Sequence, residues 1–145
     1  MVGIAVISHG ALCEGIVDSA GMIAGEIAQS KTVSLRPGMQ PDDYRGRVKD
    51  AIEELDDGDG VLVLADIAGG TPYNSCAILM KEMDNIAVVT GLNLPMVVSV
   101  TLEREADTPL EALVKAAQEA GVEGVKVLQT GRRKAAEQNE EEEDL

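Results

Sequence analysis

The sequence of 145 residues contains neither phenylalanine nor tryptophan, and Tyr44 and Tyr73 are its only aromatic residues. Sites for flavins or single-stranded nucleic acid depend on stacking against aromatic rings, so both ligand classes are disfavoured. Basic residues are also scarce, with 12 against 26 acidic residues and a net charge of −14. Such a chain repels nucleic acid and anionic membrane surfaces, and it suits partners with a basic face.

Residues that bind metals or form disulfides are equally rare. Cys13 and Cys76 stand far apart, and His9 is the only histidine. Isolated cysteines without a signal peptide predict reduced thiols in a cytoplasmic protein. No phosphate-binding loop of the G-x-x-x-x-G-K-[ST] type is present, and no apolar run approaches the ~20 residues of a membrane span. We therefore expect no cofactor, no metal ion and no membrane segment.

Short apolar runs alternate with stretches of helical spacing along the chain. Strands are expected at residues 3–7, 31–35, 61–65, 86–90 and, with a weaker pattern, 125–128. Helices are expected at residues 11–28, 41–57, 71–83, after 93–95, and from 107–109 to 121. This alternation predicts a mainly parallel sheet covered by helices on both faces, within one α/β domain of residues 1–130. Residues 131–145 are expected to form a disordered acidic tail.

Two ionisable residues stand at the carboxyl ends of expected strands, where parallel α/β sheets collect functional groups. His9 follows the first strand and Asp66 follows the third. A neutral imidazole is a nucleophile at neutral pH and also a reasonable leaving group, provided that an acceptor fixes its tautomer. Asp66 is the natural acceptor. Each residue alone is also explained by helix capping or a loop hydrogen bond, and the sequence does not give the strand order that would bring them together.

The turn from Gly69 through Gly70 and Thr71 to Pro72 precedes an expected helix. Two glycines let a backbone approach a ligand closely, and a helix start offers free N–H groups and partial positive charge to a phosphoryl group. A tight structural turn is the alternative explanation.

Five short segments, taken together, resemble one known family. They are ISHG at 7–10, AGMIAGE at 20–26, PG at 37–38, DIAGGTPYN at 66–74 and TGLNLPM at 90–96. Their order closely resembles the IIA component of the mannose/fructose/sorbose family of the bacterial phosphoenolpyruvate-dependent sugar phosphotransferase system (PTS). The resemblance covers about residues 1–130.

The resemblance implies a phosphocarrier in which His9 takes a phosphoryl group on Nε2 from phosphorylated HPr. His9 would pass the group to a IIB component, and so indirectly to the membrane components IIC and IID. Asp66 would bind Nδ1, and Thr71 matches a Ser/Thr beside the phosphoryl site. From the backbone argument above, we expect Gly10, Gly69, Gly70 and Thr71 to bind the phosphoryl group. The implied fold has three layers, with four parallel strands and a fifth antiparallel edge strand, residues 125–128 here, exchanged within a homodimer.

The sequence departs from the family pattern in three places, and two rival functions stay open. Ala68 stands where an aromatic residue is usual, which bears on packing against partners, and Tyr73 replaces a common phenylalanine. Thirdly, some relatives continue into a IIB domain, whereas this chain stops in an acidic tail, so we expect IIB to be a separate protein. The rivals are the phosphocarrier subunit of a dihydroxyacetone kinase system and a non-catalytic regulatory α/β module.

Overall fold

A computed structural model describes residues 1–131 of the chain. The expected acidic tail lies, except for Gly131, outside the described residues. Strands and helices alternate as the sequence predicts. The strands are β1 (Gly3–His9), β2 (Ser30–Leu35), β3 (Val61–Ala65) and β4 (Ile86–Val89). The helices are α1 (Leu12–Ala24), α2 (Pro41–Leu55), α3 (Gly70–Leu79), α4 (Leu94–Glu103) and α5 (Leu110–Glu123).

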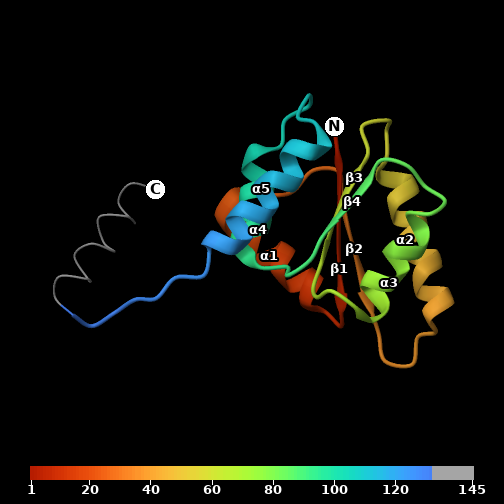
Figure 1. Ribbon diagram of the computed structural model, residues 1–145, viewed down its shortest axis with the longest axis horizontal. Helices are drawn as coiled ribbons and strands as arrows, with labels where there is room; N and C mark the ends of the chain where they lie inside the picture. Colours follow the sequence, from red (N-terminus) through yellow and green to blue (C-terminus); the bar gives the residue numbers. More distant parts are fainter. Residues whose placement is uncertain (132–145) are drawn as a thin grey trace.

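The four strands form a parallel sheet in the order β2-β1-β3-β4. Helices α1, α4 and α5 cover one face, and α2 and α3 cover the other (Figure 1). Each face has its own aliphatic core, one containing Ile4 and Leu62 and the other Ile7 and Val63. The predicted three-layer α/β architecture is therefore confirmed.

The central strands are apolar along their whole length because both of their faces are buried. All five residues of β3 and the first six of β1 are buried. The flanking helices begin at conventional signals: α2 has Pro41 at its start with acidic residues in its first turn. The Asn93 side chain caps α4 by accepting a hydrogen bond of 3.0 Å from the Met96 N–H.

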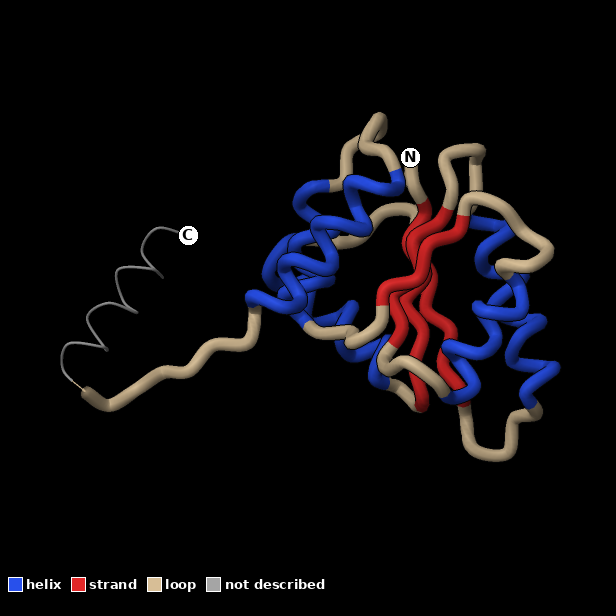
Figure 2. The backbone as a smooth tube through the Cα atoms, in the orientation of Figure 1, coloured by secondary structure: helices blue, strands red, loops and turns tan. Residues whose placement is uncertain are grey.

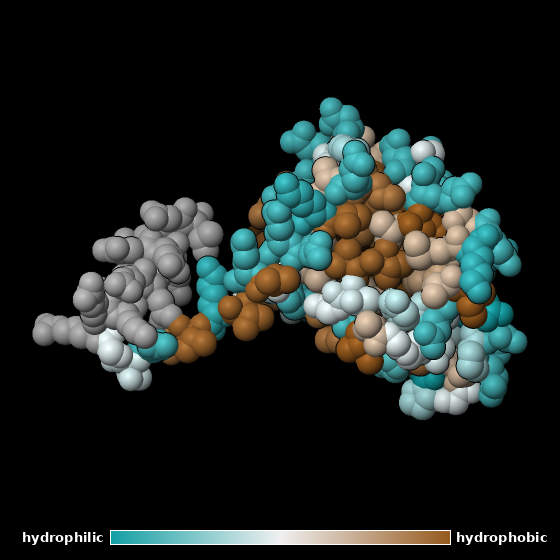
Figure 3. Space-filling view, viewed as in Figure 1, coloured by the Kyte–Doolittle hydropathy of each residue, from teal (hydrophilic) through white to brown (hydrophobic). Residues whose placement is uncertain are grey.

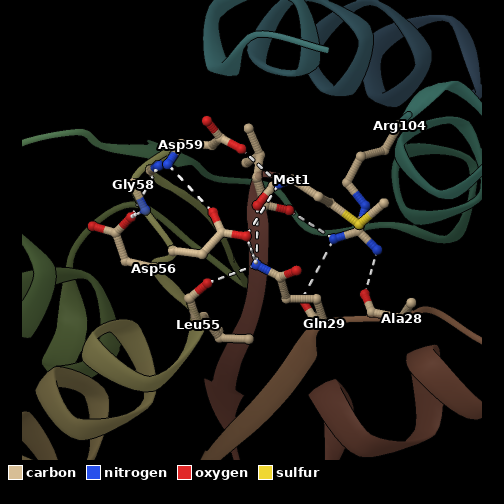
Figure 4. A network of polar contacts seen from close by, with 11 residues as sticks. Met1, Ala28, Gln29, Leu55, Asp56, Gly58, Asp59 and Arg104 are labelled. Atoms are coloured by element: carbon tan, nitrogen blue, oxygen red, sulfur yellow. Dashed lines mark hydrogen bonds and ion pairs between the residues drawn. The ribbon is translucent and has the colours of Figure 1, made fainter. Parts of the chain in front are cut away.

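A polar network closes the amino edge of the sheet, the edge opposite His9 (Figure 4). Gln29 donates from Nε2 to the carbonyls of Met1 (2.9 Å) and Leu55 (2.8 Å). The Arg104 guanidinium donates to the carbonyls of Val2, Ala28 and Gln29. These contacts join the end of α4 to the starts of β1 and β2 at the amino edge of the sheet.

The fifth strand expected at residues 125–128 is not formed in this single chain. Residues 124–130 have no regular secondary structure and leave the body as an extended segment (Figure 2). Val125, Val127 and Leu128 are 80%, 65% and 75% exposed. The expected helix from residue 11 to 28 is also shorter, because Gly25 leaves helical geometry with a φ of 85° and ends α1 at Ala24.

Candidate active site

His9 and Asp66 lie side by side at the carboxyl edge of the sheet. His9 is the last residue of β1, and Asp66 directly follows β3, the strand that pairs with β1. In the sheet, β2 lies on one side of β1 and β3 lies on its other side, so the direction of the strand order changes at β1. The site therefore occupies the point where the strand order reverses, which is where open α/β sheets bind their ligands.

One carboxylate oxygen of Asp66 holds His9 twice. Its Oδ2 atom lies 2.9 Å from the His9 backbone nitrogen and 2.7 Å from Nδ1 of the imidazole ring. The other oxygen, Oδ1, accepts a hydrogen bond of 2.9 Å from the Ile67 N–H. The His9 side chain is 47% exposed, whereas that of Asp66 is 9% exposed. The His9 ring is therefore exposed to solvent, and the carboxylate that holds it is largely buried.

The protonation of the pair follows from these contacts. Burial alone would raise the pKa of Asp66, but the hydrogen bonds from the His9 N–H, the His9 ring and the Ile67 N–H outweigh it, and the pKa lies below its usual value. An ionised carboxylate only accepts hydrogen bonds. In a neutral His9 ring the proton must therefore be on Nδ1, and Nε2 keeps its free electron pair.

Nε2 of His9 faces the first residue of α3. A Cβ atom added to Gly70 would lie 2.9 Å from Cε1 and 3.1 Å from Nε2 of the ring. The helix begins at Gly70 without a side-chain cap, and its first backbone N–H groups have no intrahelical partner. A group attached to Nε2 would therefore meet free N–H donors and the positive end of a helix dipole.

Gly69, Thr71 and Gly10 were also expected to bind the phosphoryl group, and they lie on two different segments of the chain. Gly69 precedes α3 with a φ of 84°, and Thr71, partly buried, is the second residue of the helix. Gly10 forms the turn between β1 and α1 with a φ of 60°, and its N–H donates to the Leu35 carbonyl at 2.8 Å. The Gly10 amide therefore has a partner already and serves the turn, whereas the N–H groups at the start of α3 are free for an anion.

Ser8 is a positioning residue that the sequence analysis did not single out. Its buried hydroxyl accepts a hydrogen bond of 2.8 Å from the Cys13 N–H and donates to the Gly10 carbonyl at 3.0 Å. Ser8 thereby fixes the turn that follows His9. No capping signal identifies this role in the sequence, because the N-cap position of α1 is Ala11 and Ser8 lies four residues before the helix begins.

Within residues 1–131, no group of three or more His, Cys, Asp or Glu side chains is placed to hold a metal ion. No helix in that range is both long and apolar enough to cross a membrane.

Comparison with known proteins identifies the family. The family model described as the PTS system fructose IIA component, EIIA-man, matches residues 3–118. The mannose-specific EIIAB component of Escherichia coli K12 is 31% identical over 127 residues, which is 88% of this chain and 39% of that protein. The fructose-specific EIIA component of Bacillus subtilis 168 is 30% identical over 105 residues, covering 72% of each chain.

The crystal structure of the PTS component EIIA from Streptococcus agalactiae shares the fold. Its TM-score is 0.81 at 30% sequence identity, covering 90% of this chain and 100% of that one. This chain spans 39% of the E. coli EIIAB protein, which is less than half of its length, whereas the match to the S. agalactiae EIIA structure covers all of that chain. The chain therefore belongs to the EIIA-man family, the IIA components of the mannose/fructose/sorbose branch of the phosphotransferase system.

Proposed function

We propose that His9 accepts a phosphoryl group on Nε2 from phosphorylated HPr and transfers it to a IIB component during sugar uptake. One observation carries this proposal: Asp66 binds Nδ1 at 2.7 Å, while Nε2 faces the uncapped start of α3. The ring is therefore oriented with its nucleophilic nitrogen beside a ready-made anion site.

The transfer is a displacement at phosphorus. The free electron pair of Nε2 forms the new N–P bond, and the bond between phosphorus and the donor breaks with its electrons moving to the donor. No proton has to leave His9, because the ring proton remains on Nδ1. The positive charge that develops on the ring is stabilised by the Asp66 carboxylate. The reverse sequence delivers the group to the acceptor.

The phosphoryl oxygens are proposed to accept hydrogen bonds from the N–H groups at the start of α3. Gly70 and Thr71 contribute these N–H groups, and Gly69 lets the loop reach the helix start with its positive φ. The Thr71 hydroxyl adds a further donor. Such local donors matter in a chain with a net charge of −14, since the phosphoryl group adds further negative charge.

HPr and IIB are proposed to reach His9 in the cytoplasm by docking over the carboxyl edge. Leu12 and Ile67, 50% and 55% exposed, follow His9 and Asp66 closely in sequence and give this edge apolar contact area. The negative charge of the protein speeds the approach of a partner with a basic face. IIC and IID receive the group only indirectly, through IIB.

We further propose that the protein is a homodimer in which residues 125–128 pair with β4 of the second copy. Figure 3 shows apolar side chains gathered over the face where Figure 1 places β4 between α5 and α3. A groove of about 420 Å³ runs beside β4, and its lining includes Val88, Val89, Met96, Val114 and Val122. An extended segment with exposed Val125 and Val127 fits such a groove by adding a strand.

The decisive experiment supplies phosphoenolpyruvate, enzyme I and HPr to the protein and measures its mass. We expect an acid-labile gain of one phosphoryl group that the His9→Gln variant does not show. If the mass of the wild type does not increase, the proposed function is wrong. If the mass of His9→Gln increases as well, the phosphoryl group is not attached to His9. Replacing HPr and IIB with the components of a dihydroxyacetone kinase system tests the nearest rival.

A further inference from the structure

Two serines lie side by side on neighbouring strands near the carboxyl edge of the sheet. Ser8 of β1 and Ser34 of β2 are partners in the parallel register, one position before the pair formed by His9 and Leu35. Both serine hydroxyls contact Cys13 of α1, so they lie on the face that α1 covers. Successive side chains of a strand point to opposite faces, so the His9 side chain lies on the face that α2 and α3 cover.

Cys13 joins both serines to the first turn of α1. Its backbone N–H donates to Ser8 Oγ at 2.8 Å, and its Sγ atom lies 3.2 Å from Ser34 Oγ. Ser34 uses its hydroxyl proton to donate to Oε1 of Glu14 at 3.2 Å, so the Cys13 thiol is the donor to Ser34. Arg36 donates from Nη2 to both carboxylate oxygens of Glu14 at 3.1 Å. The start of α1 is therefore bound to β1 and to β2.

The two peptide groups that follow His9 depend on the same contacts. The Gly10 N–H donates to the Leu35 carbonyl at 2.8 Å, and the Gly10 carbonyl accepts from the Ser8 hydroxyl at 3.0 Å. Asp66 binds His9 from β3, at the backbone nitrogen and at Nδ1. The backbone around His9 is therefore held by Asp66 on one side and by the Ser8 turn on the other.

We propose that Ser34 is a positioning residue for phosphoryl transfer at His9. Its hydroxyl acts from the opposite face of the sheet through Cys13, which sets the position of the Ser8 hydroxyl and hence the turn after His9. This inference rests on the proposed function, because its consequence is the angle at which Nε2 meets the phosphorus atom of the donor. A misplacement of about 1 Å in such a reaction can slow it about 10²-fold.

The test measures how fast phosphorylated HPr loads His9, by rapid quench over a range of HPr concentrations and at a temperature at which circular dichroism shows every variant folded. Ser34→Ala should lower the maximal rate at least fivefold and leave the half-saturating HPr concentration within about twofold, because the change acts on the alignment of the ring. Ser34→Thr keeps a hydroxyl and should restore at least half of the wild-type rate.

Ser30→Ala is the matched control. Ser30 lies on the same strand and the same face as Ser34, and its hydroxyl donates to the Ile27 carbonyl at 2.9 Å, near the amino edge of the sheet. The maximal rate of this variant should stay at the wild-type value. An equal loss in Ser30→Ala would mean that any lost hydrogen bond on β2 has the same effect, and it would overturn the inference.

A double-mutant cycle tests the route from Ser34 to His9. Ser8→Ala and Ser34→Ala loosen the same turn, so the rate loss of the double variant should be well below the product of the two single losses. Losses that multiply would overturn the inference. If Ser8→Ala does not fold, the variants of Ser34 and Ser30 decide alone.

The same measurements separate this inference from the proposed function. If wild-type His9 takes no phosphoryl group, both fail together. If the wild type is fully phosphorylated and Ser34→Ala loads at the same maximal rate, the positioning role of Ser34 is overturned and the proposed function stands.

Discussion

A single oxygen of Asp66, Oδ2, binds both the backbone nitrogen and the ring Nδ1 of His9. The backbone contact fixes where β1 ends relative to β3, and the ring contact fixes the tautomer. The same atom therefore sets the position of His9 and the nitrogen that can react. This shared contact makes Asp66 the residue whose substitution is most informative.

Asp66→Asn should slow phosphoryl transfer to His9 by about 10²–10⁴-fold, on the scale seen when the carboxylate of a catalytic histidine is replaced by an amide. The amide lacks the negative charge that stabilises the phosphorylated ring, and an amide nitrogen at the Oδ2 position would face the His9 N–H and place the ring proton on Nε2. Rapid-quench measurement of phosphorylated protein gives the rate. A variant as fast as the wild type would show that Asp66 does not set the tautomer.

Gly70→Ala should abolish or severely slow phosphorylation, because its Cβ would lie 2.9 Å and 3.1 Å from Cε1 and Nε2 of His9. Gly69→Ala is the matched control. Both glycines have a φ above 80°, so each alanine strains the backbone by about 1–2 kcal/mol, but a Cβ on Gly69 meets nothing within 4 Å. The two variants should lose similar stability in urea, and only Gly70→Ala should lose the fast rate. Equal rates would contradict the assignment of Gly70 to the phosphoryl site.

Acid stability should depend on Asp66, whose pKa is lowered by its hydrogen bonds against the opposing effect of burial. A lowered pKa means that the carboxylate stabilises the fold fully above the unfolded value of about 3.9, and that this contribution is lost as pH falls through the lower folded value. The urea midpoint of the wild type should therefore fall more steeply below about pH 4 than that of Asp66→Asn. Parallel curves between pH 3 and pH 7 would argue against this linkage.

Arg104→Lys should destabilise the fold by about 1–3 kcal/mol, since a lysine cannot reproduce the fork that binds three backbone carbonyls. Arg45→Lys is the control, because among residues 1–131 the contact of the Arg45 guanidinium is a surface ion pair of 3.1 Å with Asp42. We expect that control to change the free energy of unfolding by less than about 0.5 kcal/mol. Urea denaturation followed by circular dichroism measures both.

Val125→Asp/Val127→Asp should shift the protein from dimer toward monomer if residues 125–128 pair with β4 of a second copy. Charged side chains cannot pack against the valines that line the groove beside β4 without losing hydration. Lys126→Ser, between the two valines and on the other side of an extended strand, should leave the dimer intact. Light scattering at several concentrations distinguishes the two states, and a double variant that remains dimeric would contradict the strand exchange.

The four parallel strands were predictable because their signals are local. β3, for instance, is an apolar run that starts after Gly60 and ends at Asp66. The strand order was not predictable, since it depends on how α1 and α2 pack on opposite faces. The order β2-β1-β3-β4 is what makes His9 and Asp66 neighbours.

The site itself was predicted unevenly for the same reason. His9, Asp66 and Gly70 could be selected from the sequence by residue type and by position after a strand or before a helix. The role of Gly10 could not, because its N–H donates to the Leu35 carbonyl, and that contact depends on the pairing of β1 with β2. Residues 125–128 have an apolar pattern of their own, yet they form no strand within the described chain, because a local pattern does not supply a neighbouring strand. Contacts between distant segments are the part that sequence periodicity leaves open.

Because His9 is the only histidine in the sequence and Asp66 holds its ring at Nδ1, the protein carries a built-in spectroscopic probe. Histidine labelled with nitrogen-15 would give signals from a single imidazole, so its two ring nitrogens need no assignment by mutagenesis. The chemical shifts of that pair would report the tautomer before the donor arrives, the phosphorylated nitrogen afterwards, and the return to the starting state. The protein should be prepared without a polyhistidine tag, because signals from the histidines of the tag would overlap with those of His9.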